Sequence, residues 1–141
     1  MEKRIQLGAL LASVTTAYNQ HATDVFKLHQ LAPTQARILL MLWLGKGLKM
    51  SDIAKSLDLE ASNVTVIIDK LEMLGLIKRQ ASINDRRVKT ISFTRRGKRL
   101  AKALIEEVTN LPALRALTSD EIDQLIVLFT KLVQTSPQDD K

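Results

Sequence analysis

The chain has 141 residues, a formal net charge of +6 and a hydrophobic content of 45%. This length and apolar content allow one compact unit with a buried core and helical extensions, but leave no room for a second domain. With no cysteine in the sequence, a disulfide framework, a thiol redox switch and a thiolate metal site are excluded. No apolar run approaches the roughly 18 residues that span a bilayer, and the N-terminus lacks a signal-peptide cleavage pattern, so we expect a cytoplasmic protein without membrane contact.

The positive charge is concentrated in the middle of the chain. Residues 44–100 carry 13 Lys and Arg against 6 Asp and Glu, whereas residues 101–141 carry 4 against 7. A basic middle between less basic ends favours a polyanionic partner for the middle and a different role for the ends. On charge alone, an ordinary solvated surface is an equally good interpretation.

Residues 3–29 have the spacing of one long helix. Its main apolar stripe, in alternating steps of four and three, consists of Leu7, Leu11, Val14, Tyr18, His21, Val25 and Leu28. This repeat is typical of a helix packed along another helix. Ile5, Leu10 and Phe26 lie off the stripe, so the helix needs a further partner, either the last helix of the chain or a second subunit.

Two shorter helices are expected next. Pro33 starts the first at a tolerated first-turn position, and Gly45 and Gly47 end it. The apolar residues that we expect to lie together on it are Ile38, Leu39, Leu42 and Trp43. Residues 48–50 are expected to be a linker, after which Ser51 caps a helix. The inward residues of this second helix are Ile53, Ala54 and Leu57.

Residues 60–74, directly after this helix, have the spacing of another amphipathic helix. The apolar stripe consists of Val64, Ile67, Ile68, Leu71 and Leu74, and Gly75 is the expected C-terminal cap. The outward face and its flanks carry Ser62, Asn63, Thr65, Val66, Asp69 and Lys70. Two short helices joined by a tight turn, the second with small polar groups facing outward, predict a helix-turn-helix whose second helix enters a DNA groove.

A β-hairpin is predicted immediately after this helix. Residues 76–81 and 88–93 favour strands, through Ile77, Val88, Ile91 and Phe93. The turn between them holds Asp85, Arg86 and Arg87. A hairpin in this position is the wing of a winged helix, and its guanidiniums suit phosphate or a narrow minor groove, with Asp85 holding one of them in place. The alternative is a solvated, ion-paired turn.

The remaining chain is predicted to be helical. Thr94 caps a helix whose apolar stripe is Leu100, Ala103, Leu104 and Val108, and Pro112 breaks it. The first turns are crowded with Arg95, Arg96, Lys98 and Arg99. Cations there oppose the helix dipole, which suggests a role near phosphate. Residues 118–121 form a capping box for a last, very apolar helix, which would bury its surface by pairing with the first helix of a second copy. Residues 136–141 are expected to be a disordered tail.

The order of these elements resembles the multiple-antibiotic-resistance regulator (MarR) family. The segments that carry the resemblance are MSDIAKSLDLEASNVTVIIDKLEMLGLIKR, the DRR of the wing and ISFTRRGKRL. It covers nearly the whole chain and is best over residues 33–104. It implies a mainly α fold with a small β-hairpin wing, as a single domain over residues 1–141. Residues 33–104 would be the winged helix-turn-helix lobe, and residues 3–30 and 105–136 the dimerisation region. The resemblance also implies a homodimer that reads a palindromic operator and whose repression is often relieved by a small molecule or another signal.

The resemblance also implies roles for individual residues. Ser62, Asn63, Thr65 and Val66 would face bases in the major groove. The helical spacing itself puts Lys70 at the edge of that face. Arg87, steadied by Asp85, would enter the minor groove, and Arg86 would lie near phosphate. Many relatives carry Arg at the position of Val66, so a thymine methyl becomes the expected target there, while Asn63 suits an adenine edge. Glu60 is a weaker N-cap than Ser or Asp, and the usual wing proline is absent.

No sequence motif indicates catalysis, a cofactor or a metal. The patterns G-x-S-x-G, H-E-x-x-H and G-x-x-x-x-G-K-[ST] are absent from the sequence. His21 and His29 are eight residues apart, about 12 Å along a helix, too far to ligate one metal within a chain. Asp69 and Glu72 are expected to be surface groups that pair with Lys70 or Arg79 rather than an acid–base pair.

Three residues are candidates for a ligand pocket. His21 is first interpreted as a hydrogen-bonded core or interface residue, and Tyr18 and Trp43 as core residues. The alternative interpretation places Tyr18, His21 and Trp43 in the wall of a pocket for a small aromatic or weakly acidic ligand.

We therefore expect a ligand-responsive, homodimeric repressor that binds double-stranded DNA by sequence. A winged-helix module that binds an acidic protein through the same surface is the alternative. A nucleoid-type protein that binds DNA without sequence preference is a third hypothesis.

Overall fold

The computed structural model describes residues 1–45, 48–82, 84–85 and 87–135. It contains two compact units, Met1–Val108 and Thr109–Lys141. Gly47, Arg86 and the tail at residues 136–141 lie outside the described residues.

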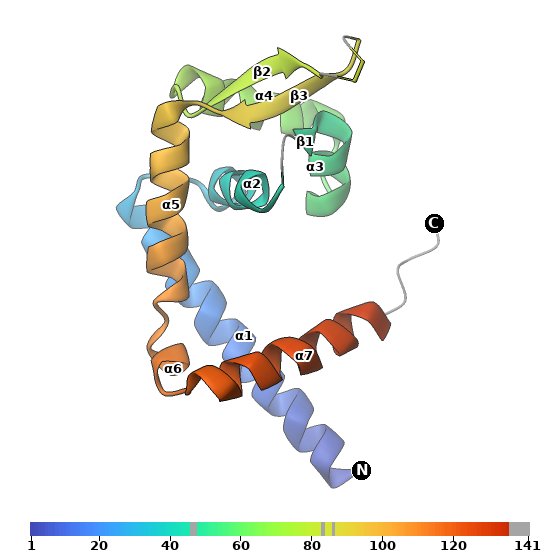
Figure 1. Ribbon diagram of the computed structural model, residues 1–141, viewed down its shortest axis with the longest axis vertical. Helices are drawn as coiled ribbons and strands as arrows, with labels where there is room; N and C mark the ends of the chain where they lie inside the picture. The colour runs from blue at the N-terminus through green and yellow to red at the C-terminus, as the bar shows by residue number, and fades with distance from the viewer. Residues whose placement is uncertain (46–47, 83, 86, 136–141) are drawn as a thin grey trace. The chain divides into compact units, whose positions relative to one another are not determined.

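The first unit is a winged helix-turn-helix preceded by a long helix (Figure 1). Its helices are α1 (Glu2–Leu28), α2 (Pro33–Leu44), α3 (Met50–Leu57), α4 (Ala61–Met73) and α5 (Arg95–Thr109). Its strands are β1 (Leu48–Lys49), β2 (Ile77–Ala81) and β3 (Lys89–Phe93). The predicted fold class, mainly α with a β-hairpin wing, is confirmed.

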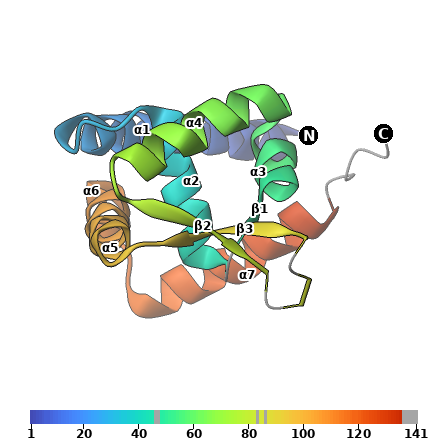
Figure 2. The same ribbon diagram turned by 90° about the horizontal axis from the view of Figure 1, so that it is seen from above.

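The sheet has one strand more than the sequence predicts. Residues 48 and 49, expected to be part of a linker, form β1 and pair antiparallel with β3, with Leu48 opposite Ile91. Strand β3 lies between β1 and β2, as Figure 2 shows. Because β1 runs directly into α3, the helix starts at Met50 and Ser51 is not its cap. Instead, the Asp52 carboxylate accepts a hydrogen bond of 3.2 Å from the backbone N–H of Lys49.

The core of the first unit is formed by residues from every helix and from the sheet. Its largest fully buried side chains include Ile38 and Leu39 of α2, Ile53 of α3, Ile68 and Leu71 of α4, Ile91 of β3 and Leu104 of α5. The expected stripe of α1 is only partly right. Phe26, placed off the stripe, is buried with Val25, whereas Leu28 is 77% exposed.

Helix α4, the expected DNA-recognition helix, ends as Gly75 predicts. Gly75 has φ +67°, a conformation that glycine adopts without steric cost. The N–H groups of Gly75 and Leu76 donate to the carbonyl oxygens of Glu72 and Leu71, the pair of bonds that defines a Schellman motif. Leu74 lies beyond the last helical residue and is 43% exposed, so its inclusion in the buried stripe was wrong.

Thr94 caps α5 and joins it to the end of α4. Its hydroxyl accepts a hydrogen bond of 3.0 Å from the Gly97 N–H and lies 2.6 Å from the Gly75 carbonyl oxygen, to which it donates. Gly97 is buried against the Leu76 backbone. This contact fixes where α5 leaves the wing.

The second unit contains α6 (Pro112–Arg115) and α7 (Ser119–Thr135). Helix α5 ends at Thr109, and Pro112 occupies the first turn of α6. The predicted capping box is present, because Glu121 accepts a hydrogen bond from the Thr118 N–H at 2.8 Å and its own N–H donates to the Thr118 hydroxyl at 3.3 Å. The exposed apolar residues of α7 are Ile122, Ile126, Val127, Leu128, Phe129, Leu132 and Val133.

Candidate nucleic-acid interface

Helix α4 buries one face and leaves the predicted DNA-reading face free. Val64, Ile68 and Leu71 are fully buried, which fixes the rotation of the helix about its axis. The predicted contact residues on the other side are all exposed: Ser62, Asn63, Thr65, Val66 and Lys70. Glu60 is the N-cap residue, and its side chain makes no capping hydrogen bond.

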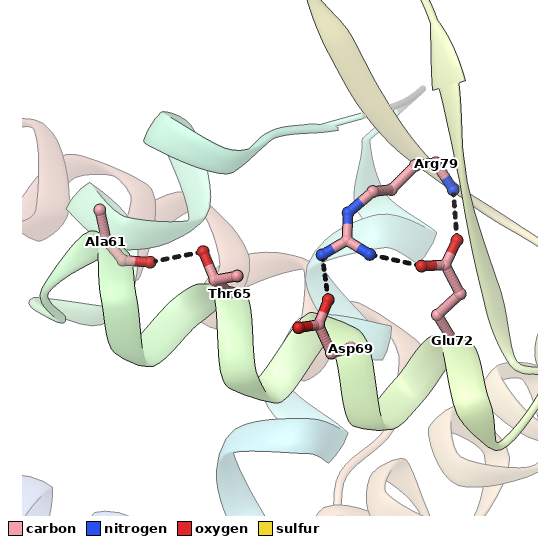
Figure 3. A network of polar contacts seen from close by, with 5 residues as sticks. All are labelled: Ala61, Thr65, Asp69, Glu72 and Arg79. Carbon is pink, nitrogen blue, oxygen red and sulfur yellow. Dashed lines mark hydrogen bonds and ion pairs between the residues drawn. The ribbon is translucent and has the colours of Figure 1, made fainter.

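Thr65 has its hydroxyl proton engaged within the helix. Its Oγ1 donates a hydrogen bond of 2.9 Å to the carbonyl oxygen of Ala61, one turn earlier (Figure 3). The side chain therefore offers outside groups a methyl and an acceptor oxygen, but no free donor. Val66, beside it, is 53% exposed. This part of the helix is suited to apolar contact.

The wing turn is organised by backbone hydrogen bonds. The Ser82 N–H donates to the Val88 carbonyl oxygen at 2.8 Å. The Asp85 carboxylate accepts a 2.9 Å bond from the backbone N–H of Arg87. Asp85 thus holds the chain at Arg87 through the backbone, where the sequence suggested a contact with a guanidinium. The Arg87 side chain is exposed.

The cations at the start of α5 are exposed, and one of them also contacts the end of α4. Arg95, Arg96, Lys98 and Arg99 are all exposed. Arg96 also donates from Nη1 to the carbonyl oxygen of Leu74 at 2.9 Å. It therefore places positive charge at the C-terminal end of α4, where the helix dipole favours it. The sequence did not reveal this contact, because the two residues are 22 positions apart.

Arg79 on β2 connects the wing to the recognition helix. Its Nη2 lies 2.5 Å from Asp69 Oδ1, and its Nη1 donates to Glu72 Oε2. The backbone N–H of Arg79 donates to the other Glu72 oxygen at 3.2 Å. Figure 3 shows the guanidinium between the two carboxylates. The pairing of Asp69 and Glu72 with Arg79 is confirmed, and the hydrogen bond to Asp69 is the main cause that raises the pKa of Arg79.

The candidate pocket residues lie in different environments. Tyr18 lines a cavity of about 390 Å³ between α1 and α2, together with Phe26, Arg37 and Leu40. His21 and Trp43 do not line this cavity. His21 Nε2 lies 2.9 Å from the Glu107 carbonyl oxygen, and His29 Nε2 lies 3.0 Å from the Glu107 side chain, so both histidines tie α1 to α5.

Neither a metal centre nor a membrane span is found in the described part of the chain. No three His, Cys, Asp or Glu residues there are grouped so as to hold a metal ion. No helix in those ranges is long and apolar enough to cross a bilayer.

These features define a winged helix-turn-helix protein. A family model described as "MarR family" matches residues 31–89. The uncharacterized HTH-type transcriptional regulator YkoM of Bacillus subtilis is 30% identical over 137 residues, which cover 93% of this chain and 86% of YkoM. The chain belongs to the MarR family.

Two solved structures extend the comparison. The YusO protein of Bacillus subtilis is 28% identical, with a TM-score of 0.65 and 96% of each chain covered. A mutant of MepR from S. aureus bound to an oligodeoxyribonucleotide is 25% identical, with a TM-score of 0.61, covering 92% of this chain and 96% of that chain. The fold is therefore shared along almost the whole chain.

Proposed function

We propose that this protein is a homodimeric transcriptional regulator of the cytoplasm that binds double-stranded DNA by sequence and represses transcription. The observation that carries the proposal is the exposed face of α4, a helix that contacts the basic wing through Arg79 and the basic start of α5 through Arg96. The resemblance to a MepR mutant bound to an oligodeoxyribonucleotide supports it. Phosphate contacts would supply affinity, and base contacts would supply the choice of site.

The roles proposed for single residues follow from their chemistry. Asn63 would pair with an adenine edge, and Val66 with the methyl of a thymine. Ser62 and Thr65 would contact neighbouring bases, with Lys70 reaching phosphate. Arg87 would enter the minor groove. Arg86, which lies outside the described residues, is proposed as a phosphate contact on the same wing.

The salt dependence of binding to random duplex DNA tests this function. A DNA-binding surface that neutralises several phosphates gives a steep negative slope of log affinity against log salt. A winged-helix module for an acidic protein gives no detectable duplex binding at low salt. A nucleoid-type protein would bind random and selected duplexes equally. Sites selected from random DNA and compared with the DNA beside the protein's own gene would identify the operator.

The proposed homodimer is supported by the apolar surface that both terminal helices leave open. Leu7 and Val14 of α1 are about half exposed, as are Ile126 and Leu128 of α7. A second copy would bury these faces. The variant Ile126→Glu should sediment as a monomer and bind a palindromic site weakly. Gln124→Glu, which adds the same charge on the same helix, is the control and should remain a dimer.

A small aromatic, weakly acidic ligand is proposed for the cavity between α1 and α2. Phe26 and Leu40 provide apolar walls, and the Arg37 guanidinium, which is exposed, provides a cation for a carboxylate. Tyr18 is the predicted pocket residue that lines it. Titration with benzoate should release heat with the wild type and none with Arg37→Ala. Equal binding by both proteins would exclude this site.

A further inference from the structure

The recognition helix is acidic, which is unexpected for a helix that faces DNA. Residues 60–73 contain Glu60, Asp69 and Glu72 but a single cation, Lys70. The side chains of Asp69 and Glu72 are 53% and 40% exposed. Carboxylates near a phosphate backbone oppose binding unless their charge is compensated. A compensating charge must therefore come from another element.

Arg79 supplies this charge from the wing. Its guanidinium uses one terminal nitrogen on Asp69 and the other on Glu72. The Arg79 side chain is only 25% exposed. A guanidinium held by two carboxylates is poorly placed to contact phosphate as well, because two of its donors already have anionic partners and its charge is offset by both carboxylates.

Glu72 also satisfies a backbone group of the wing. Among the described residues, strand β2 pairs with β3 alone and so lies at an edge of the sheet. On its open side, the Arg79 N–H donates to Glu72 Oε1 at 3.2 Å. An edge strand otherwise leaves such groups to water or to another chain. The helix and the wing are therefore joined by a hydrogen bond from the Arg79 backbone N–H to the Glu72 carboxylate and by two ion pairs.

We propose that Arg79 is a positioning residue for DNA binding, which neutralises Asp69 and Glu72 and holds β2 against α4 without touching DNA. This inference rests on the proposed function. It assigns Arg79 a role different from that of Arg87, whose exposed side chain is proposed to contact DNA directly. Both carboxylates of the network are at least 40% exposed, and ion pairs with solvent-accessible partners contribute little to stability, so variants of this network should fold.

Two variants test the proposal in fluorescence-anisotropy titrations with a selected operator. Arg79→Gln leaves two uncompensated carboxylates and should bind at least about tenfold more weakly than the wild type. The triple variant Arg79→Gln, Asp69→Asn, Glu72→Gln carries no charge in the network. It should return to within about threefold of wild-type affinity, with an unchanged salt slope. Thermal unfolding followed by circular dichroism verifies that each variant folds.

Each other outcome overturns the proposal. If Arg79 contacts phosphate, the triple variant stays weak and its salt slope becomes shallower by about one unit per DNA-binding lobe. If the triple variant stays weak with an unchanged slope, neutralisation is not the role of Arg79. If Arg79→Gln binds like the wild type, Arg79 has no role in binding. If Arg79→Gln fails to fold, the triple variant alone tests the proposal: an affinity within about threefold of the wild type supports it, and weaker binding overturns it. Failure of the proposed function itself is distinguishable, because the wild type would then not bind duplex DNA.

Discussion

Gly97 lies so close to Leu76 that a Cβ added at position 97 would stand 1.7 Å from the Leu76 carbonyl oxygen. The contact is between the first turn of α5 and the start of the wing. No side chain can rotate away to relieve it, since the atoms that a methyl would meet belong to the backbone. The approach of α5 to the wing therefore depends on glycine at this position.

Gly97→Ala should destabilise the first unit by about 3 kcal/mol, the upper end of the usual cost of overpacking, because the backbone must move to admit the methyl group. Chemical denaturation of the variant and the wild type measures this difference. Lys98→Ala is the control, since Lys98 is the next residue and is exposed, and it should change stability by less than about 0.5 kcal/mol. Equal stability of Gly97→Ala and the wild type would contradict the described packing.

Arg87→Ala should weaken operator binding while the dimer and the thermal unfolding curve stay unchanged. The side chain is exposed and its backbone N–H is held by Asp85, so removal of the guanidinium costs a DNA contact and no packing. The salt slope should become shallower by about one unit per lobe. Lys102→Ala, an exposed cation on α5, is the control and should bind normally. Loss of folding in Arg87→Ala would mean that the wing arginine is structural.

If Val66 contacts a thymine methyl group, the affinity of the protein for DNA should depend on that methyl group at one thymine in each half-site. Replacing that thymine with deoxyuridine should reduce wild-type affinity by about 1 kcal/mol, close to the free energy of burying one methyl group. Val66→Ala should bind the two duplexes with similar affinity, because the contact is then already lost. If the wild type binds with the same affinity whichever thymine is replaced by deoxyuridine, a contact between Val66 and a thymine methyl group is excluded.

The capping box of α7 should make the second unit less stable in acid. Hydrogen bonding from the Thr118 backbone lowers the pKa of Glu121. A carboxyl group whose pKa is lower in the folded state stabilises the fold above its unfolded pKa, about 4.3 for Glu, and loses that contribution as the pH falls through the folded value. Wild type should exceed Glu121→Gln in melting temperature at pH 7 and lose this advantage below about pH 4. An advantage that persists in acid would exclude the ionised carboxylate as its cause.

The elements that the sequence predicted well are those with local signals. The stripe of Val64, Ile68 and Leu71 gave the orientation of α4, and Gly75 gave its end, because both depend on neighbours within a few residues. The capping box of α7 was equally local. The strands of the hairpin also follow from local residue preferences, and their predicted bounds lie within one residue of those found.

The features that the sequence missed depend on partners distant in the chain. Strand β1 has two residues and exists through pairing with β3, more than 40 residues later. Arg96 caps α4 across 22 residues, and Phe26 becomes buried only where α1 meets the rest of the core. Arg37 was overlooked because nothing in its sequence neighbourhood indicates the cavity that it lines. Such contacts have no short-range pattern from which to predict them.

The most direct test of the account is the affinity for a selected palindromic duplex relative to a scrambled duplex of the same composition, measured at physiological salt. A specific regulator should prefer the selected site by at least about a thousandfold. Equal affinity for both duplexes, or no binding to either, would contradict the central claim that this protein recognises DNA by sequence.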